Sequence, residues 1–131
     1  MRITVDTNVL VRLAVRDDVK QVKIAGKILA NATLIVITLP CLCEFIWVLL
    51  RTYQFERADA AVAIRTLLTV ANVEVNRPAV EAGISVLEAG GDFADGVIAY
   101  EGNWLGGTTF VSFDKKAVAL LAARGQSTKL I

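Results

Sequence analysis

Short runs of apolar and β-branched residues alternate along this chain with longer segments whose apolar residues recur at helical spacing. The runs expected to form strands are residues 2–5, 34–37, 73–75, 109–112 and 128–131. The segments expected to form helices are residues 7–14, 18–32, 38–52, 56–70, 76–89, 92–104 and 115–124. Strands separated by helices pair in parallel and are covered by helices on both faces. The alternation therefore predicts an α/β fold around a parallel sheet.

The length of the chain favours a single domain over residues 1–131, because 131 residues can enclose one hydrophobic core but hardly two. Apolar residues make up 55% of the chain, which is at the upper end for a globular protein. The helix expected over residues 40–51 is apolar nearly all round, and a sheet can cover only one side of it. We therefore expect a homodimer, and a hydrophobic groove near this helix that accepts a partner peptide.

Composition excludes several kinds of chemistry. The chain has no histidine, which rules out a Ser-His-Asp triad, proton transfer by histidine and the usual zinc sites. A net charge of +1 provides no overall attraction for nucleic acid, so a polyanion would have to be held by a local basic patch or through a metal. Cys41 and Cys43 have no further Cys or His to complete a metal site, and we expect them to be core side chains in a reducing compartment.

The most hydrophobic stretch, residues 34–50, is not expected to cross a membrane. It contains Pro40 and Glu44, and its uninterrupted apolar part is short, so a buried strand followed by a buried helix is the expected structure. A charged residue, Asp6, follows within the first six residues, so the N-terminal segment is not expected to be a secretory signal. We expect a cytoplasmic protein.

Two aspartates directly follow expected strands. Asp6 comes after the first strand and Asp114 after the fourth, so both are expected at the carboxyl edge of the sheet, where α/β proteins bind ligands. Either could instead be a helix N-cap, which is a common position for aspartate. Because Thr7 and Asn8 are capping residues too, a third capping group at Asp6 would be redundant, and we favour a functional role for it.

Further carboxylates are expected in helices. Glu44 is the only charge in the apolar run 39–50, where burial is costly unless a cation compensates it; the alternative to a metal is a pair with Arg51. Asp92 and Asp95 are three residues apart and would share a helical face. We assign the helix cap to Asp92 and the functional role to Asp95.

The four functional candidates are expected to lie near one another: Asp6, Glu44, Asp95 and Asp114. Clustered carboxylates repel one another, and a hard divalent cation such as Mg²⁺ would remove that conflict. The pattern therefore predicts metal-assisted phosphoryl chemistry. Candidate phosphate contacts are the basic residues Arg12, Arg51, Arg57, Lys115 and Lys116.

Four segments together resemble the motifs of PIN-domain ribonucleases in order and spacing. They are residues 5–10, 43–45, 92–99 and 109–115. The length of the chain, as an isolated domain, looks most like the VapC-type toxins of prokaryotic toxin–antitoxin pairs. One departure from the family pattern is Gly96, where many relatives have alanine.

This resemblance implies a three-layer α/β/α sandwich with a parallel sheet of about five strands. It implies one or two Mg²⁺ or Mn²⁺ ions, endonucleolytic cleavage of RNA, and metal ligation by Asp6, Glu44, Asp95 and Asp114. Supporting groups for the metal or the substrate would be Thr7, Asn8, Asp92, Ser112, Lys115 and Arg51. It further implies a homodimer and an antitoxin protein that blocks the site; DNA would be contacted only indirectly, through that antitoxin.

Three alternatives remain open. A haloacid-dehalogenase-type phosphatase needs a second aspartate two residues after the first, where this chain has Asn8. A receiver domain needs a pair of acids at the first strand, which Asp6 and Thr7 do not provide. An inactive PIN-like module that binds RNA or protein would retain the repulsion of four carboxylates without compensation, so the enzyme is the favoured interpretation.

Overall fold

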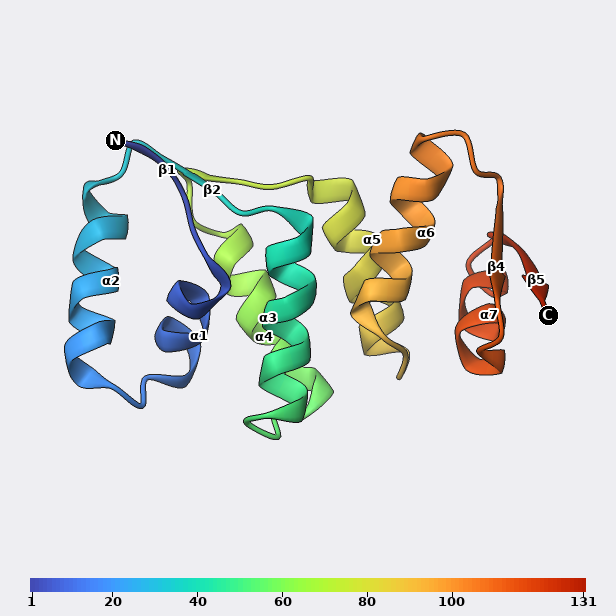
Figure 1. The fold of residues 1–131 in the computed structure, drawn as a ribbon, viewed down its shortest axis with the longest axis horizontal. Helices are drawn as coiled ribbons and strands as arrows, with labels where there is room; N and C mark the ends of the chain where they lie inside the picture. The colour runs from blue at the N-terminus through green and yellow to red at the C-terminus, as the bar shows by residue number, and fades with distance from the viewer. The chain divides into compact units, whose positions relative to one another are not determined.

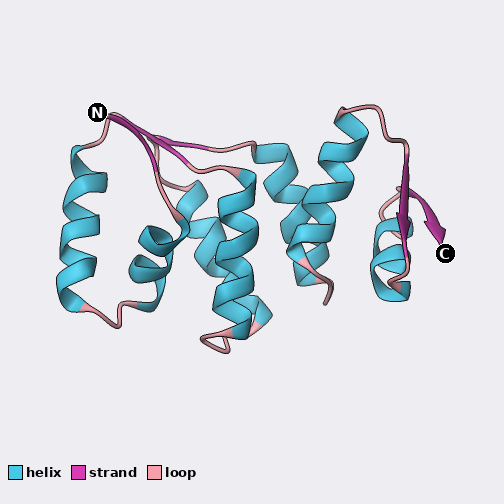
Figure 2. Cartoon of the chain, viewed as in Figure 1, coloured by secondary structure: helices cyan, strands magenta, loops and turns pink.

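The computed structural model describes residues 1–131 and divides the chain into two compact units, Met1–Asn76 and Arg77–Ile131. The elements of the first unit are, in chain order, β1 (Arg2–Thr4), α1 (Thr7–Val15), α2 (Val19–Asn31), β2 (Leu34–Val36), α3 (Leu39–Arg51), α4 (Arg57–Leu68) and β3 (Val73–Glu74) (Figure 1). The elements of the second unit are α5 (Arg77–Glu88), α6 (Phe93–Trp104), β4 (Thr109–Ser112), α7 (Lys115–Ala122) and β5 (Ser127–Leu130) (Figure 2).

The first unit contains a parallel sheet in the order β1–β2–β3. Ile3 of β1 is paired with Ile35 of β2, and Ile35 is paired in turn with Val73 of β3. Because β1 and β2 run the same way, the chain leaves both strands at one edge of the sheet and enters α1 and α3 there. The two helices contact each other, so their first turns lie close together at this edge.

Helices that contact one another in sequence enclose the core of the first unit: α1 contacts α2 and α3, and α3 contacts α4. The side chains at its centre are Leu10, Val11, Ile35, Phe45, Leu49 and Ile64. The helix α2 is less deeply packed, with Ala25 as its one buried residue. The core therefore fixes α1 and α3 firmly, and these are the helices that follow the carboxyl edge of the sheet.

Local hydrogen bonds determine where two of these helices begin. The side chain of Asp18 accepts the backbone N–H of Gln21 at 3.0 Å at the start of α2. The hydroxyl of Thr38 accepts the backbone N–H of Cys41 at 3.4 Å at the start of α3, where Pro40 occupies the first turn. Both caps follow from the sequence, because such bonds need only residues that are neighbours in the chain.

In the second unit, α5 and α6 pack with their backbones in contact. A Cβ atom added to Gly96 would lie 2.4 Å from the carbonyl oxygen of Ala82, closer than real Cβ contacts. Ile84 and Phe93 are buried beside this contact. The strands β4 and β5 pair in parallel, and α7 contacts both of them. The glycine at 96 therefore permits a helix–helix approach that alanine would prevent.

The expected α/β class is confirmed, with seven helices and five strands that all pair in parallel. The strands are grouped as three in the first unit and two in the second. Residues 34–50 form β2 and most of α3, as expected. None of the helices has the length and apolar character required to cross a bilayer.

Candidate functional site

Asp6 lies at the carboxyl edge of the first unit's sheet, directly before α1. One of its carboxylate oxygens, Oδ1, accepts the backbone N–H of Thr7 at 2.8 Å, so Asp6 is the N-cap of α1. The expectation that a cap at Asp6 would be redundant is therefore wrong, since neither Thr7 nor Asn8 takes that position. The cap uses one oxygen and orients the carboxylate, and the second oxygen keeps its capacity to accept.

Glu44 is exposed on α3, and this corrects the expectation that it is a buried charge needing compensation. The apolar residues around it in the sequence, including Leu42, Phe45 and Ile46, are buried on the opposite side of the helix. Nor does Glu44 form an ion pair with Arg51, which is also exposed. The argument for a functional Glu44 therefore depends on its position near the sheet edge and no longer on the cost of burial.

A buried contact joins the first turns of α1 and α3. The hydroxyl of Thr7 donates to the sulfur of Cys41 at 3.8 Å, and that thiol donates to the carbonyl oxygen of Val5 at 3.7 Å. Burial raises the pKa of the Cys41 thiol, the bond from Thr7 lowers it, and the negative charges of Asp6 and Glu44 raise it further. The same thiol is therefore within electrostatic reach of both carboxylates, which lie at one edge of this unit.

The second unit brings another set of carboxylates together around α6. Asp92 is the N-cap of α6 and accepts the backbone N–H of Ala94 at 3.1 Å, as the sequence predicts. Asp95 lies in the first turn and is half-buried. The pKa of Asp95 is raised, first because burial removes water from its carboxylate and second because Asp92 and Asp114 add negative charge nearby. Ionised Asp95 is therefore unfavourable here unless a cation compensates it.

Asp114 is held in a tight turn between β4 and α7. Its Oδ1 accepts the backbone N–H groups of Lys116 at 2.9 Å and Ala117 at 3.1 Å, so it caps α7. Its own N–H donates to the hydroxyl of Ser112 at 2.9 Å. Ser112 thus positions the backbone of Asp114, while Lys115 is exposed beside it. As at Asp6, capping and a functional role are compatible, because one oxygen makes both capping bonds.

Some expected supporting residues have different roles. Asn8 is exposed, and Thr7 is buried against Cys41. Arg12, expected as a phosphate contact, donates to the hydroxyl of Tyr53 at 2.6 Å and pairs with Asp17 at 2.8 Å. Its guanidinium is therefore used to connect α1 with the end of α3. Sequence reasoning missed this connection and the bond between Thr7 and Cys41, because both join residues that are distant in the chain.

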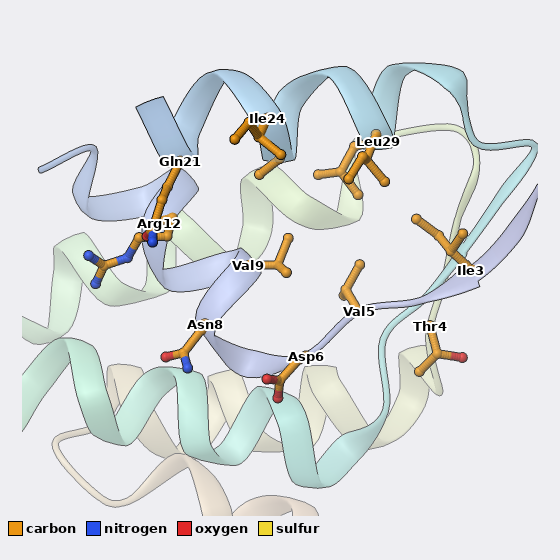
Figure 3. Close-up of a pocket in the computed structure, with 12 residues that line it drawn as sticks. Ile3, Thr4, Val5, Asp6, Asn8, Val9, Arg12, Gln21, Ile24 and Leu29 are labelled. Atoms are coloured by element: carbon orange, nitrogen blue, oxygen red, sulfur yellow. The ribbon is translucent and has the colours of Figure 1, made fainter. Parts of the chain in front are cut away.

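An apolar hollow of about 630 Å³ lies between α2 and the segment formed by β1 and α1. Figure 3 shows Val5 and Val9 pointing toward Ile24 and Leu29, whereas Asp6 points away from these side chains. Exposed Ile24 on α2 contributes to the hollow. Asp6 thus lies at the margin of the apolar hollow, with its carboxylate directed away from the apolar side chains.

The structure therefore associates Asp6 with Glu44 in the first unit and Asp95 with Asp114 in the second. Neither unit by itself gathers three or more acidic or cysteine side chains in an arrangement that could hold a metal ion. Glu44 lies within α3 and Asp95 in the first turn of α6, whereas Asp6 and Asp114 follow parallel strands. This is the position at which α/β proteins bind their ligands.

The PIN domain family matches this sequence over residues 3–120. The chain belongs to the PIN domain family. The match covers both units and includes every candidate carboxylate, and it ends within α7, before β5. No curated protein and no solved structure gives a significant match to the chain.

PIN domains are generally nucleases, which are hydrolases that act on nucleic acid. The donors in this PIN domain suit the divalent cations that such nucleases usually employ. All four candidate ligands are carboxylates, the class of oxygen donor that Mg²⁺ and Mn²⁺ prefer. Burial first, and the negative charges of Asp92 and Asp114 second, raise the pKa of Asp95. By donor type these residues suit a hard divalent cation, although neither unit by itself gathers three of them around one point.

Proposed function

We propose that this chain is a Mg²⁺- or Mn²⁺-dependent endoribonuclease and that it acts as the toxin of a type II toxin–antitoxin pair. The observation that carries the proposal is family membership over residues 3–120, combined with carboxylates at the ends of parallel strands. PIN domains generally act on nucleic acid. The toxin assignment is supported by the length of the chain, which resembles that of VapC-type toxins.

One or two divalent ions would be held by Asp6, Glu44, Asp95 and Asp114. Such an ion supplies Lewis-acid activation of the phosphodiester and charge stabilisation that carboxylates alone cannot give. Four carboxylates repel a phosphodiester as well as one another, so cleavage requires that this charge be offset. The chain has no imidazole that could move the proton in its place.

The chain's own residues contribute orientation. The caps fix one oxygen of Asp6 and one oxygen of Asp114, so the second oxygen of each carboxylate is presented in a defined direction. Thr7 and Ser112 hold the backbone on which these carboxylates are carried. Lys115 is exposed next to Asp114 and would contact a substrate phosphate.

The test is cleavage of a fluorescently labelled single-stranded RNA pool by the purified protein. We expect cleavage with Mg²⁺ or Mn²⁺ and none with EDTA. Asp6→Asn and Asp95→Asn should abolish cleavage, whereas Glu101→Gln, at an exposed acid farther along α6, should leave it unchanged. Cleavage that persists in EDTA would exclude the metal mechanism. RNA binding without cleavage at every metal concentration would indicate an inactive binding module.

The proposed partners are a second copy of the chain and an antitoxin protein. The apolar hollow beside α2 is surface that a partner helix could cover, which supports a protein partner. Induced expression should arrest growth of host cells, and Asp6→Asn should relieve the arrest. Light scattering of the purified protein reports the oligomeric state; a monomer at high micromolar concentration would contradict the homodimer.

A further inference from the structure

Four residues of α3 form an exposed stripe on one side of the helix: Pro40, Glu44, Trp47 and Arg51. They are spaced by four, three and four residues, the spacing that places side chains on a single helical face. The opposite face carries the buried residues Cys41, Leu42, Phe45, Ile46 and Leu49. We call the last three of these residues, Glu44, Trp47 and Arg51, the α3 stripe.

Trp47 is the one large aromatic residue of the stripe, and 57% of its surface is exposed. A rise of about 1.5 Å per residue places it about 4.5 Å along the helix axis from Glu44, with Arg51 about 6 Å beyond it. The aromatic ring therefore lies between a candidate metal ligand and a guanidinium, an order that suits the binding of single-stranded nucleic acid along the helix. We call this binding surface the track. Bases stack on aromatic rings, and phosphates pair with arginine.

The stripe leads into a hollow of about 570 Å³ at the corner between α3 and α4. Arg51 and Arg57 line it from the two helices, together with the acidic Glu56. Arg51 makes no hydrogen bond or ion pair within the chain. The guanidinium of Arg51 at this hollow is therefore the charge that can contact an anion.

We propose, on the basis of the proposed ribonuclease function, that the α3 stripe binds the substrate strand beside the cleaved bond. A base stacks on Trp47, and the phosphate of a neighbouring nucleotide contacts Arg51 in the hollow. The contacts involve the base face and the backbone, so they select single-stranded RNA without reading its sequence. The carboxylate of Glu44 at the start of the stripe faces the phosphate to be cut.

The experiment measures binding of a fluorescein-labelled, unstructured RNA oligonucleotide by anisotropy, with Asp95→Asn as the background so that the RNA stays intact. Trp47→Ala should weaken binding about tenfold or more, in line with the loss of one base stack, and Trp47→Phe should retain most of the affinity. Arg51→Ala should weaken binding and also reduce the slope of log affinity against log salt by about 0.7, the contribution of one phosphate on a single strand. Trp47→Ala should leave that slope unchanged.

Two controls are matched to these variants. Trp104→Ala removes the only other tryptophan, which is 80% exposed at the end of α6, and should change the affinity less than twofold. In a Trp104→Phe protein, added RNA should quench the fluorescence of Trp47, which reports stacking directly. Lys27→Ala, at an exposed cation on α2, should leave the salt dependence unaltered.

The outcomes separate this proposal from the proposed function. If the parent cleaves RNA and both Trp47→Ala and Arg51→Ala leave RNA affinity and its salt dependence unchanged, the proposed track is contradicted and the proposed ribonuclease function stands. If the parent does not cleave RNA but the two variants lose RNA affinity as expected, the track is supported as an RNA-binding surface and the proposed ribonuclease function is contradicted. If Trp47→Ala converts a dimer to a monomer without changing RNA affinity, the stripe is an interface between copies and the proposal fails.

Discussion

The substitution Gly96→Ala tests whether α5 and α6 pack as closely as the structure shows. The new Cβ would lie 2.4 Å from the carbonyl oxygen of Ala82 and 2.8 Å from the Cα of Gly83, whereas ordinary van der Waals contacts begin at 3.4 Å. These are backbone atoms, so no side-chain rotation can relieve the overlap. The helix α6 would have to move away from α5 by about 1 Å, which opens gaps elsewhere in the interface.

The magnitude follows from two opposing effects. Alanine is favoured over glycine inside a helix by about 1 kcal/mol. Overpacking a core costs about 1–3 kcal/mol, and the upper end applies where backbone atoms collide. We therefore expect Gly96→Ala to lower the free energy of unfolding by about 2 kcal/mol. Gly102→Ala is the matched control in the same helix: its Cβ would meet nothing within 4 Å, so it should gain about 1 kcal/mol.

Urea unfolding of the two variants and the parent, followed by circular dichroism in EDTA, measures this difference of about 3 kcal/mol. Gly96 directly follows Asp95, so displacement of α6 should also reduce metal-dependent RNA cleavage in Gly96→Ala, but not in Gly102→Ala. If Gly96→Ala is as stable as the parent, or gains stability like Gly102→Ala, the close approach of the two helices is refuted.

Three further substitutions test individual contacts. Asp95→Asn removes an acid whose pKa is raised, so its ionised form is disfavoured in the folded chain. The parent should therefore lose stability relative to this variant as the pH rises above the usual aspartate range. Equal profiles of stability against pH for the two proteins in EDTA would contradict the crowding of charge around Asp95. Tyr53→Phe removes the acceptor of the 2.6 Å bond from Arg12 and should cost about 1 kcal/mol in urea unfolding, whereas Tyr100→Phe should cost almost nothing. Asp114→Ala loses the cap of α7 and should lower the free energy of unfolding by about 1 kcal/mol. Asp114→Asn should keep the cap and still lose RNA cleavage. A fully active Asp114→Asn would show that this residue is only a cap.

Local chemistry made much of this chain predictable from its sequence. The alternation of strands and helices follows from apolar periodicity, which is a property of each segment by itself. The caps at Thr38 and Asp92 depend on hydrogen bonds between residues two or three positions apart. The same reasoning located candidate carboxylates after strands, because parallel strands deliver their C-terminal ends to a common edge.

Which side chains meet is decided by tertiary packing, and there local reasoning failed in identifiable ways. In the apolar run of α3, periodicity left open which face is covered, so Glu44 was expected to be buried although it lies on the exposed side. At Asp6 the choice among three adjacent capping residues depends on how the chain turns out of β1.

The remaining features require residues that are far apart in the sequence. The bond between Thr7 and Cys41 joins two helices across 34 positions, and no local pattern marks it. In the sequence Gly96 is only a departure from the family pattern, whereas packing makes it the point where two backbones touch. The sequence by itself determined the elements and the kinds of side chain at their ends, since these depend on neighbours along the chain. The tertiary structure decided exposure, charge crowding and close approach, because these depend on neighbours in space.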